Sequence, residues 1–339
     1  MKKHFPRIVK LTLISLYLIF LAGSIVRMSG SGMGCPDWPK CFGYLIPPTD
    51  ESQLLWSPDY EYKNGIVIIK DEGLLVAQSD FKSSLKFEKE NWSPYKKHSY
   101  AKFNVYHTWT EYINRLASVL SGFFFLFLVV VSAKFWKENK WIPTLSFIAF
   151  LLMLFEAWLG KTVVDTVLKP SIITVHMVVG LVIVAILLTL HHIVNKHRYT
   201  TKKSNPIFTS MLWIAALFSL IQIALGTQVR QYVDEQVKLL GFENKQLSLL
   251  APELKFYIHR SFTVAIVLIN FWLFYQNEKL KLGYNKVNWI LGLLGIEILS
   301  GILMYYVDFP LGTQAIHLLF GILLFSVQFY LLLESKKAD

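Results

Sequence analysis

Long apolar runs separated by short polar stretches dominate the chain. A helix that crosses a bilayer needs roughly 20 mostly apolar residues. Eight runs meet that requirement, covering about residues 8–27, 104–133, 142–164, 172–195, 207–230, 254–276, 288–307 and 312–333. The pattern predicts an all-α integral membrane protein with eight transmembrane helices. We expect the first run to be retained as a helix, because it lacks the small-x-small cleavage site of a signal peptide.

The distribution of Lys and Arg predicts the orientation of these helices. Basic residues gather before the first run and after the second, fourth, sixth and eighth runs. The positive-inside rule then predicts a multi-pass protein with both termini in the cytoplasm. We expect it in the plasma (inner) membrane. The polar segment 28–103 becomes a large outer loop between helices 1 and 2. Its stretch NGIVIIKDEGLLVAQSD predicts two short strands around a turn, with an irregular loop as the alternative.

Composition supports a membrane protein and argues against other classes. Charged residues make up 17% of the chain, against roughly 25% in soluble domains. The net charge of +11 could indicate nucleic acid binding, but the basic residues are spread among apolar runs, which favours membrane topology. Two cysteines cannot build a disulfide framework, and the sequence has no Cys/His cluster typical of structural zinc.

The two halves of the chain, 1–195 and 207–339, repeat one another. Four matched pairs occur in the same order: GSIVR (23–27) with GTQVR (226–230), EYINR (111–115) with FYIHR (256–260), Glu156 and Gly160 with Glu297 and Gly301, and His176 and Gly180 with His317 and Gly321. Four helices separate the copies, so both copies run in the same direction. We predict two pseudo-symmetric four-helix bundles related by an axis near the membrane normal.

Four histidines share one depth. His107, His176, His259 and His317 each lie within about five residues of the start of an even-numbered run, roughly 8 Å from the outer boundary. Intramembrane ionisable residues are usually functional, and imidazole is a common axial ligand of haem iron. We therefore expect a bis-histidine haem between His259 and His317. The other five histidines are expected to be solvated or interfacial: His4, His98, His191, His192 and His197.

The N-terminal half departs from this symmetry. Asn114, a poor iron ligand, stands where the C-terminal half has His259. His107 lies two turns earlier on nearly the same face, roughly 10 Å higher. It could ligate a haem higher in the bundle, hold a propionate, or be interfacial. Unequal ligation suggests a tightly held cofactor haem in one half and an exchangeable or reacting haem in the other.

Arginines and acidic residues near the same outer edge are further candidates. Arg260 and Arg230 could pair with haem propionates, or be snorkelling helix ends. Three further cofactor-binding candidates are Arg27, Arg115 and Asn114. Glu111 shares a helical face with His107 and could act as a general base or stabilise developing positive charge. Its structural alternative is a salt bridge to Arg115. For the deeper pair Glu156 and Glu297 we expect helix–helix hydrogen bonding.

Cys35 and Cys41 flank PDWPK in the segment that follows the first run. Their predicted position outside the cytoplasm is one where disulfides persist. Spacing favours a structural disulfide that closes the loop, and a redox-active pair is the alternative.

Six segments together resemble the haem A synthase family: VRMSGSGMGCPDWPKCFG, TEYINR, ITVHMVVG, LGTQVRQYVD, YIHR and AIHLLFG. The resemblance covers nearly the whole chain apart from about residues 50–100. It implies an oxidoreductase of haem biosynthesis and cytochrome oxidase assembly. Such an enzyme oxidises the C8 methyl group of haem O to the formyl group of haem A, through successive hydroxylations to a geminal diol that loses water.

The resemblance also implies roles for individual residues. It places haem b at His259 and His317 and the substrate haem at His176. Glu111 corresponds to the carboxylate on helix 2 that is important in the family. The paired outer-loop cysteines of the family correspond to Cys35 and Cys41. The implied partners are haem O, membrane lipid, haem O synthase and an external electron acceptor such as a quinone.

One position departs from the family pattern. The usual E-x-x-H motif has Asn114 in place of histidine, which leaves the second axial ligand of the substrate site open and makes His107 the only candidate replacement on that helix. Two other functions compete with the enzyme: a di-haem b-type electron carrier, and an assembly protein that delivers haem without reacting with it.

Overall fold

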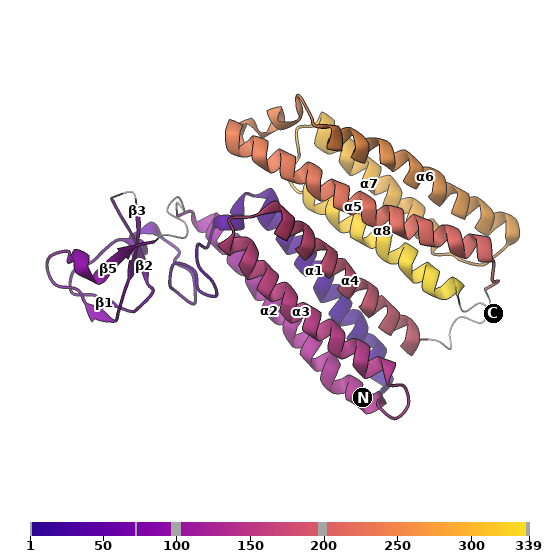
Figure 1. Cartoon of the computed structure of the whole chain (residues 1–339), viewed down its shortest axis with the longest axis horizontal. Helices are drawn as coiled ribbons and strands as arrows, with labels where there is room; N and C mark the ends of the chain where they lie inside the picture. Colours follow the sequence, from indigo (N-terminus) through magenta and orange to yellow (C-terminus); the bar gives the residue numbers. More distant parts are fainter. Residues whose placement is uncertain (1, 72, 96–102, 196–201, 337–339) are drawn as a thin grey trace. The chain divides into compact units, whose positions relative to one another are not determined.

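The computed structural model describes residues 2–71, 73–95, 103–195 and 202–336 (Figure 1). Within these ranges, eight helices are long and apolar enough to cross a membrane. They are α1 (Phe5–Met28), α2 (Val105–Ser132), α3 (Trp141–Asp165), α4 (Pro170–Val194), α5 (Pro206–Leu240), α6 (Leu254–Leu280), α7 (Val287–Tyr306) and α8 (Thr313–Ser335). The prediction of an eight-helix integral membrane protein is confirmed, while the type of membrane and the orientation stay predictions.

Helix α5 ends ten residues later than the apolar pattern predicted. The expected end was residue 230, but the helix continues through the polar stretch QYVDEQVKLL to Leu240. Two side-chain pairs at i,i+4 spacing, Arg230–Asp234 and Gln231–Glu235, stabilise this extension. The helix stops at Gly241, whose φ of 86° is accessible to glycine without steric cost. Bilayer thickness limits the apolar span of a helix but not its polar continuation.

The chain forms two compact units. The larger unit contains residues 1–21, 120–156 and 173–339, and the smaller unit contains residues 22–119 and 157–172. The expected halves 1–195 and 207–339 divide the chain by sequence similarity and stay a prediction.

In the larger unit, apolar faces of the helices meet in two clusters. One cluster brings together α1, α2, α3 and α4 with parts of α5 and α8, through buried residues such as Leu13, Phe125, Ala149, Ile183 and Phe325. The other joins α5, α6, α7 and α8, which lie side by side, through residues such as Leu212, Leu273, Leu294 and Leu331. A Cβ on Gly180 would lie 2.6 Å from the Phe20 ring, so a larger residue would force that ring to move at the contact of α4 with α1.

The smaller unit contains the long segment between α1 and α2, which is folded around short strands. A three-stranded sheet has the order β2 (Val67–Lys70), β3 (Gly73–Ala77) and β5 (Trp92–Pro94), and β1 (Glu61–Tyr62) pairs with β4 (Phe81–Lys82). The predicted hairpin is present, with Lys70 opposite Gly73 at its turn. Side chains alternate along β2. Val67 therefore packs in the cluster that holds the two cysteines, and Ile68 packs in the cluster of Tyr62 and Trp92.

Candidate functional site

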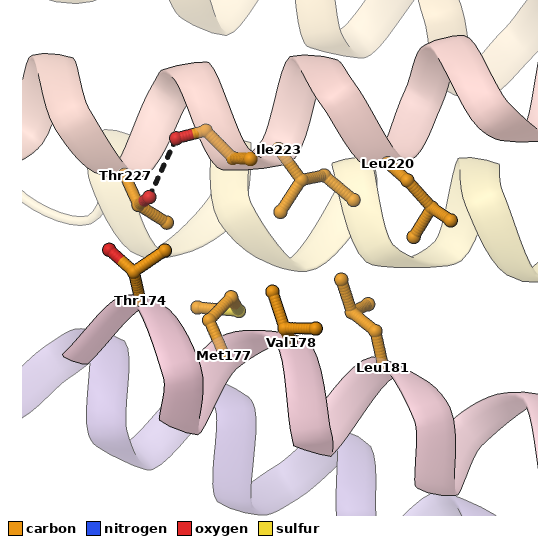
Figure 2. A pocket seen from close by; sticks show the side chains of 8 residues that line it. Thr174, Met177, Val178, Leu181, Leu220, Ile223 and Thr227 are labelled. Atoms are coloured by element: carbon orange, nitrogen blue, oxygen red, sulfur yellow. Dashed lines mark hydrogen bonds between the residues drawn. The ribbon is translucent and has the colours of Figure 1, made fainter. Parts of the chain in front are cut away.

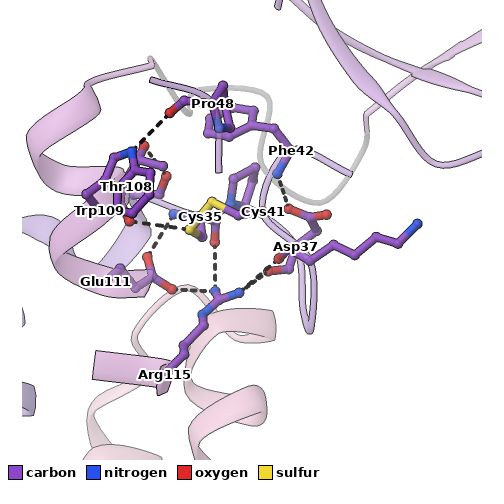
Figure 3. The surroundings of a disulfide bond; sticks show 12 residues. Cys35, Asp37, Cys41, Phe42, Pro48, Thr108, Trp109, Glu111 and Arg115 are labelled. Atoms are coloured by element: carbon purple, nitrogen blue, oxygen red, sulfur yellow. Dashed lines mark hydrogen bonds and ion pairs between the residues drawn. A yellow bond between two sulfur atoms is a disulfide. The ribbon is translucent and has the colours of Figure 1, made fainter. Parts of the chain in front are cut away.

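A disulfide bond between Cys35 and Cys41 closes the loop that follows α1 (Figure 3), so the predicted disulfide is present. The Asp37 carboxylate accepts hydrogen bonds from the backbone N–H groups of Phe42, at 2.6 Å, and Gly43, at 2.8 Å. Phe42 and Gly43 have φ values of 55° and 82°, so Asp37 holds a left-handed turn. Burial raises the pKa of Asp37 above its ordinary value, and these hydrogen bonds oppose the shift.

Glu111 and Arg115, one turn apart on α2, attach that loop to the helix. Oε2 of Glu111 accepts the backbone N–H of Cys35 at 2.8 Å, and Oε1 pairs with the Arg115 guanidinium. The guanidinium also donates to the carbonyl oxygens of Asp37 at 2.7 Å, Lys40 at 2.9 Å and Cys35 at 3.3 Å (Figure 3). Glu111 is only 4% exposed. The structural salt bridge foreseen as the alternative is therefore present, and the catalytic role of Glu111 stays a prediction.

His107, near the start of α2, is held by serines of the preceding segment. Its Nδ1 lies 2.9 Å from the Ser31 hydroxyl, which lies 2.6 Å from the Ser29 hydroxyl. The Ser29 hydroxyl donates its proton to a carbonyl of α1 at 2.8 Å. Each hydroxyl has one proton, so Ser31 donates to Ser29 and accepts the N–H at Nδ1 of His107. This hydrogen-bond assignment leaves the lone pair of His107 on Nε2, the form that binds a metal.

Asn114 lies two turns further along α2. Its Oδ1 is buried and makes no hydrogen bond with the described residues. Arg27, at the end of α1, is half-buried in the same unit. The cofactor-binding roles expected for these two residues stay predictions.

In the larger unit, two carboxylates contact histidines on the next helix. Oε2 of Glu156 on α3 pairs with Nδ1 of His176 on α4. Oε2 of Glu297 on α7 lies 3.3 Å from Nδ1 of His317 on α8. These are matched positions of the sequence repeat, and the same atoms meet in both pairs. Each glutamate therefore connects two neighbouring helices. Its partner is a candidate haem ligand, His176 for Glu156 and His317 for Glu297.

His259 and His317 face each other across the C-terminal helices. Their ring centroids are 6.3 Å apart and their planes are inclined by 74°. Two imidazoles bound on opposite sides of one metal ion, at about 2 Å each, have ring centres roughly 6 Å apart. Nδ1 of His259 is buried and has no hydrogen-bond partner among the described residues. The separation and the donor atoms therefore fit two axial ligands of a haem.

Two glycines lie beside these rings, and a side chain at Gly226 would crowd its neighbour. A Cβ on Gly226 of α5 would lie 3.2 Å from Cε1 of His259, and one on Gly301 of α7 would lie 3.6 Å from Cε1 of His317. One turn before Gly226 on α5, the Gln222 amide donates to the backbone carbonyl of His259 at 3.0 Å and to the Thr263 hydroxyl at 2.9 Å.

The arginines predicted to bind propionates have different surroundings. Arg260 is exposed, with its guanidinium 5.6 Å from the centre of the Tyr305 ring. Arg230 pairs with Asp234 at 2.7 Å, so part of its charge is already compensated within α5. Propionate binding by either residue stays a prediction.

The remaining histidines lie apart from these groups or outside the described ranges. Nδ1 of His191 lies 3.1 Å from the Tyr330 hydroxyl, and His4 is exposed. His192 is buried, so the expectation that it is solvated or interfacial is wrong. His98 and His197 lie outside the described residues.

An apolar cavity of about 90 Å³ lies between α4 and α5 (Figure 2). Its lining runs from Thr174 to Leu181 on α4 and from Leu220 to Thr227 on α5, and it contains no titratable side chain. The Thr227 hydroxyl donates to a carbonyl of its own helix at 2.7 Å. The cavity therefore suits a hydrocarbon group rather than a charged one.

Sequence reasoning missed the side chains that hold the candidate site residues in place. Asp37, Ser31, Ser300 and Gln222 were not predicted to have roles. Ser300 could have been found, because it follows Glu297 at i+3 and so shares its helical face. The position of Asp37 between two cysteines was a weaker signal.

Comparison with known proteins adds a second line of information. The family model described as cytochrome oxidase assembly protein (COX15-CtaA) matches residues 6–66 and 66–329. A protein named Heme A synthase from Shewanella oneidensis is 28% identical over 220 residues, which is 65% of this chain and 54% of that protein. A protein of the same name from Bacillus cereus is 22% identical over 183 residues, or 54% of this chain and 42% of that protein. The chain thus spans about half the length of the curated relatives it matches.

Proposed function

This chain belongs to the cytochrome oxidase assembly protein family, and on that premise we propose that it forms haem A by oxidising the C8 methyl group of haem O. The relatives named Heme A synthase support this reaction, and the four membrane histidines suit haem chemistry. Haem O has an apolar tail and charged propionates. A multi-pass membrane protein with arginines near the outer ends of its helices is therefore a suitable enzyme for it.

The observation that carries the proposal is the facing pair His259 and His317. We infer that these residues hold haem b as a resident cofactor. When bound there, haem b supplies a group that accepts and passes on single electrons. The protein's part is to fix the two rings at the observed separation and to shield them from water. His176, whose Nδ1 is engaged by Glu156, is our proposed ligand for the iron of the substrate haem.

Glu111 is the proposed catalytic carboxylate. Conversion of a methyl group to a formyl group with the oxygen atom of one water molecule releases four electrons and four protons, so a nearby base is useful. Arg115 and the Cys35 N–H each contact one oxygen of the Glu111 carboxyl group. Each of these oxygens has a second lone pair, on which Glu111 can accept a proton. The electrons must reach an acceptor outside the chain, and we propose a membrane quinone.

The test is the haem content of the purified protein from cells that make haem O. The wild type should contain haem b together with haem O or haem A. His259→Ala and His317→Ala should lose haem b, whereas Glu111→Ala should retain it and fail to convert haem O. The matched control is Glu51→Ala, which alters an exposed glutamate in the same unit.

Three outcomes would contradict parts of this proposal. Haem b alone, in stoichiometric pairs, would indicate a di-haem electron carrier. Normal conversion by Glu111→Ala would remove the catalytic role, and the Arg115 salt bridge would then be its whole function. A protein that contains no haem in any preparation would exclude both the proposed enzyme and the di-haem electron carrier.

A further inference from the structure

His317 has two polar neighbours on α7, both directed at the same ring nitrogen. The Ser300 hydroxyl lies 2.9 Å from Nδ1, and Oε2 of Glu297 lies 3.3 Å from it. Glu297 is packed against Gly321 of α8, where a Cβ would lie 3.5 Å from its Oε2. The carboxyl group is therefore confined beside the imidazole.

The hydrogen bonds assign the protonation of this ring. The Ser300 hydroxyl donates its single proton to the backbone carbonyl of Glu297 at 3.0 Å. Its oxygen can then only accept from Nδ1–H of His317. The proton of the neutral imidazole is thus on Nδ1, and the lone pair is on Nε2. A histidine with this tautomer presents Nε2 to a metal while Nδ1–H is held by acceptors, the usual arrangement of a metal ligand.

The matched pair on α3 and α4 has only part of this arrangement. Glu156 contacts Nδ1 of His176, as Glu297 does for His317. The residue that corresponds to Ser300 is Leu159, which has no hydroxyl group. Nδ1 of the C-terminal histidine therefore has a hydroxyl acceptor and a carboxylate beside it, and its N-terminal counterpart lacks the serine.

We propose that Glu297 and Ser300 are positioning residues that fix His317 as an Nε2 ligand and increase its electron donation to haem iron. This inference rests on the proposed binding of haem b at His259 and His317. Acceptors at Nδ1–H make an imidazole a stronger donor, which stabilises ferric iron and lowers the reduction potential of the haem. They also prevent rotation of the ring, so haem b is retained.

The test compares haem retention and midpoint potential in four variants of the full-length protein. Glu297→Ala should lose haem b to an external acceptor about 10- to 100-fold faster than the wild type, the usual cost of removing an outer partner of a metal ligand. Its haem should have a higher midpoint potential. Ser300→Ala should change both quantities in the same direction, by less. Glu297→Gln should restore retention, because its amide oxygen can still accept from Nδ1–H.

The fourth variant is the matched control Glu156→Ala. It removes the same carboxyl group from the other pair and should leave the potential of the His259–His317 haem unchanged. Wild-type retention and potential in both Glu297→Ala and Ser300→Ala would overturn the inference while leaving the proposed function intact. A wild-type protein that takes up no haem would instead overturn the proposed function, and this inference with it.

Discussion

Replacing Arg115 by alanine should release the disulfide loop from α2. The guanidinium makes three hydrogen bonds to loop carbonyls and one ion pair to Glu111. Its removal leaves a carboxylate that is 4% exposed without a compensating charge. The loop should consequently open far more often, although the disulfide bond stays intact.

The size of the effect follows from the burial of the pair. Removing one partner of a buried ion pair costs about 3–5 kcal/mol. The lost hydrogen bonds to carbonyl oxygens also destabilise the closed loop, at about 1.5–3 kcal/mol for a hydrogen bond to a charged group. This energy is partly included in the cost of breaking the ion pair, so we do not add the two. We expect the opening free energy of the loop to fall by about 3–5 kcal/mol, which is about 10²- to 10⁴-fold in an equilibrium constant.

Amide hydrogen exchange measures this opening directly. The informative amides are those of Cys35, which donates to Glu111, and of Phe42 and Gly43, which donate to Asp37. Their exchange should accelerate by the factor above in Arg115→Ala. Arg7→Ala, which alters an exposed arginine in α1, is the matched control and should leave these amides unchanged.

The double variant Glu111→Gln with Arg115→Ala tests the physical reason. If the cost arises from an unpaired buried charge, neutralising Glu111 should recover part of the lost protection. Exchange in Arg115→Ala at the wild-type rate would refute the reasoning. A double variant that opens as readily as Arg115→Ala would show that the carbonyl contacts, not the charge, dominate.

Two further predictions concern Gly226 and Asp37. Gly226→Ala places a methyl group 3.2 Å from Cε1 of His259, so the ring must shift and haem b per protein should fall several-fold. Gly295→Ala, which meets nothing within 4 Å, should retain it, and equal haem content in both variants would contradict the packing argument. Burial raises the pKa of Asp37 above 3.8, so the folded loop binds a proton more tightly than the unfolded chain. This contribution to stability is complete below pH 3.8 and is lost as the pH rises through the folded-state pKa. Hydrogen exchange of the Phe42 and Gly43 amides, corrected for intrinsic rates, should therefore accelerate as the pH rises from 3.8 through the folded-state pKa of Asp37. Asp37→Asn should abolish this pH dependence of exchange.

The sequence alone determined the number and approximate bounds of the membrane helices. Apolar runs of bilayer length are a local property, because backbone hydrogen bonds must be satisfied within the span itself. The hairpin of β2 and β3 was also predictable, since its alternation and turn lie within one short stretch. The end of α5 was not, because side-chain pairs beyond Arg230 continued the helix after the apolar pattern had stopped.

Tertiary structure decided what surrounds each candidate residue. The sequence identified Glu111 and the cysteines, but 76 positions separate Glu111 from Cys35, and only folding brings the carboxylate to that N–H. It matched Glu297 with Glu156 and His317 with His176, yet it did not show that these carboxyl groups meet Nδ1 of the histidines. A repeat in sequence specifies residue types at equivalent depths in the membrane. Which atoms meet depends on the rotation and packing of neighbouring helices, and these depend on contacts distant in the chain.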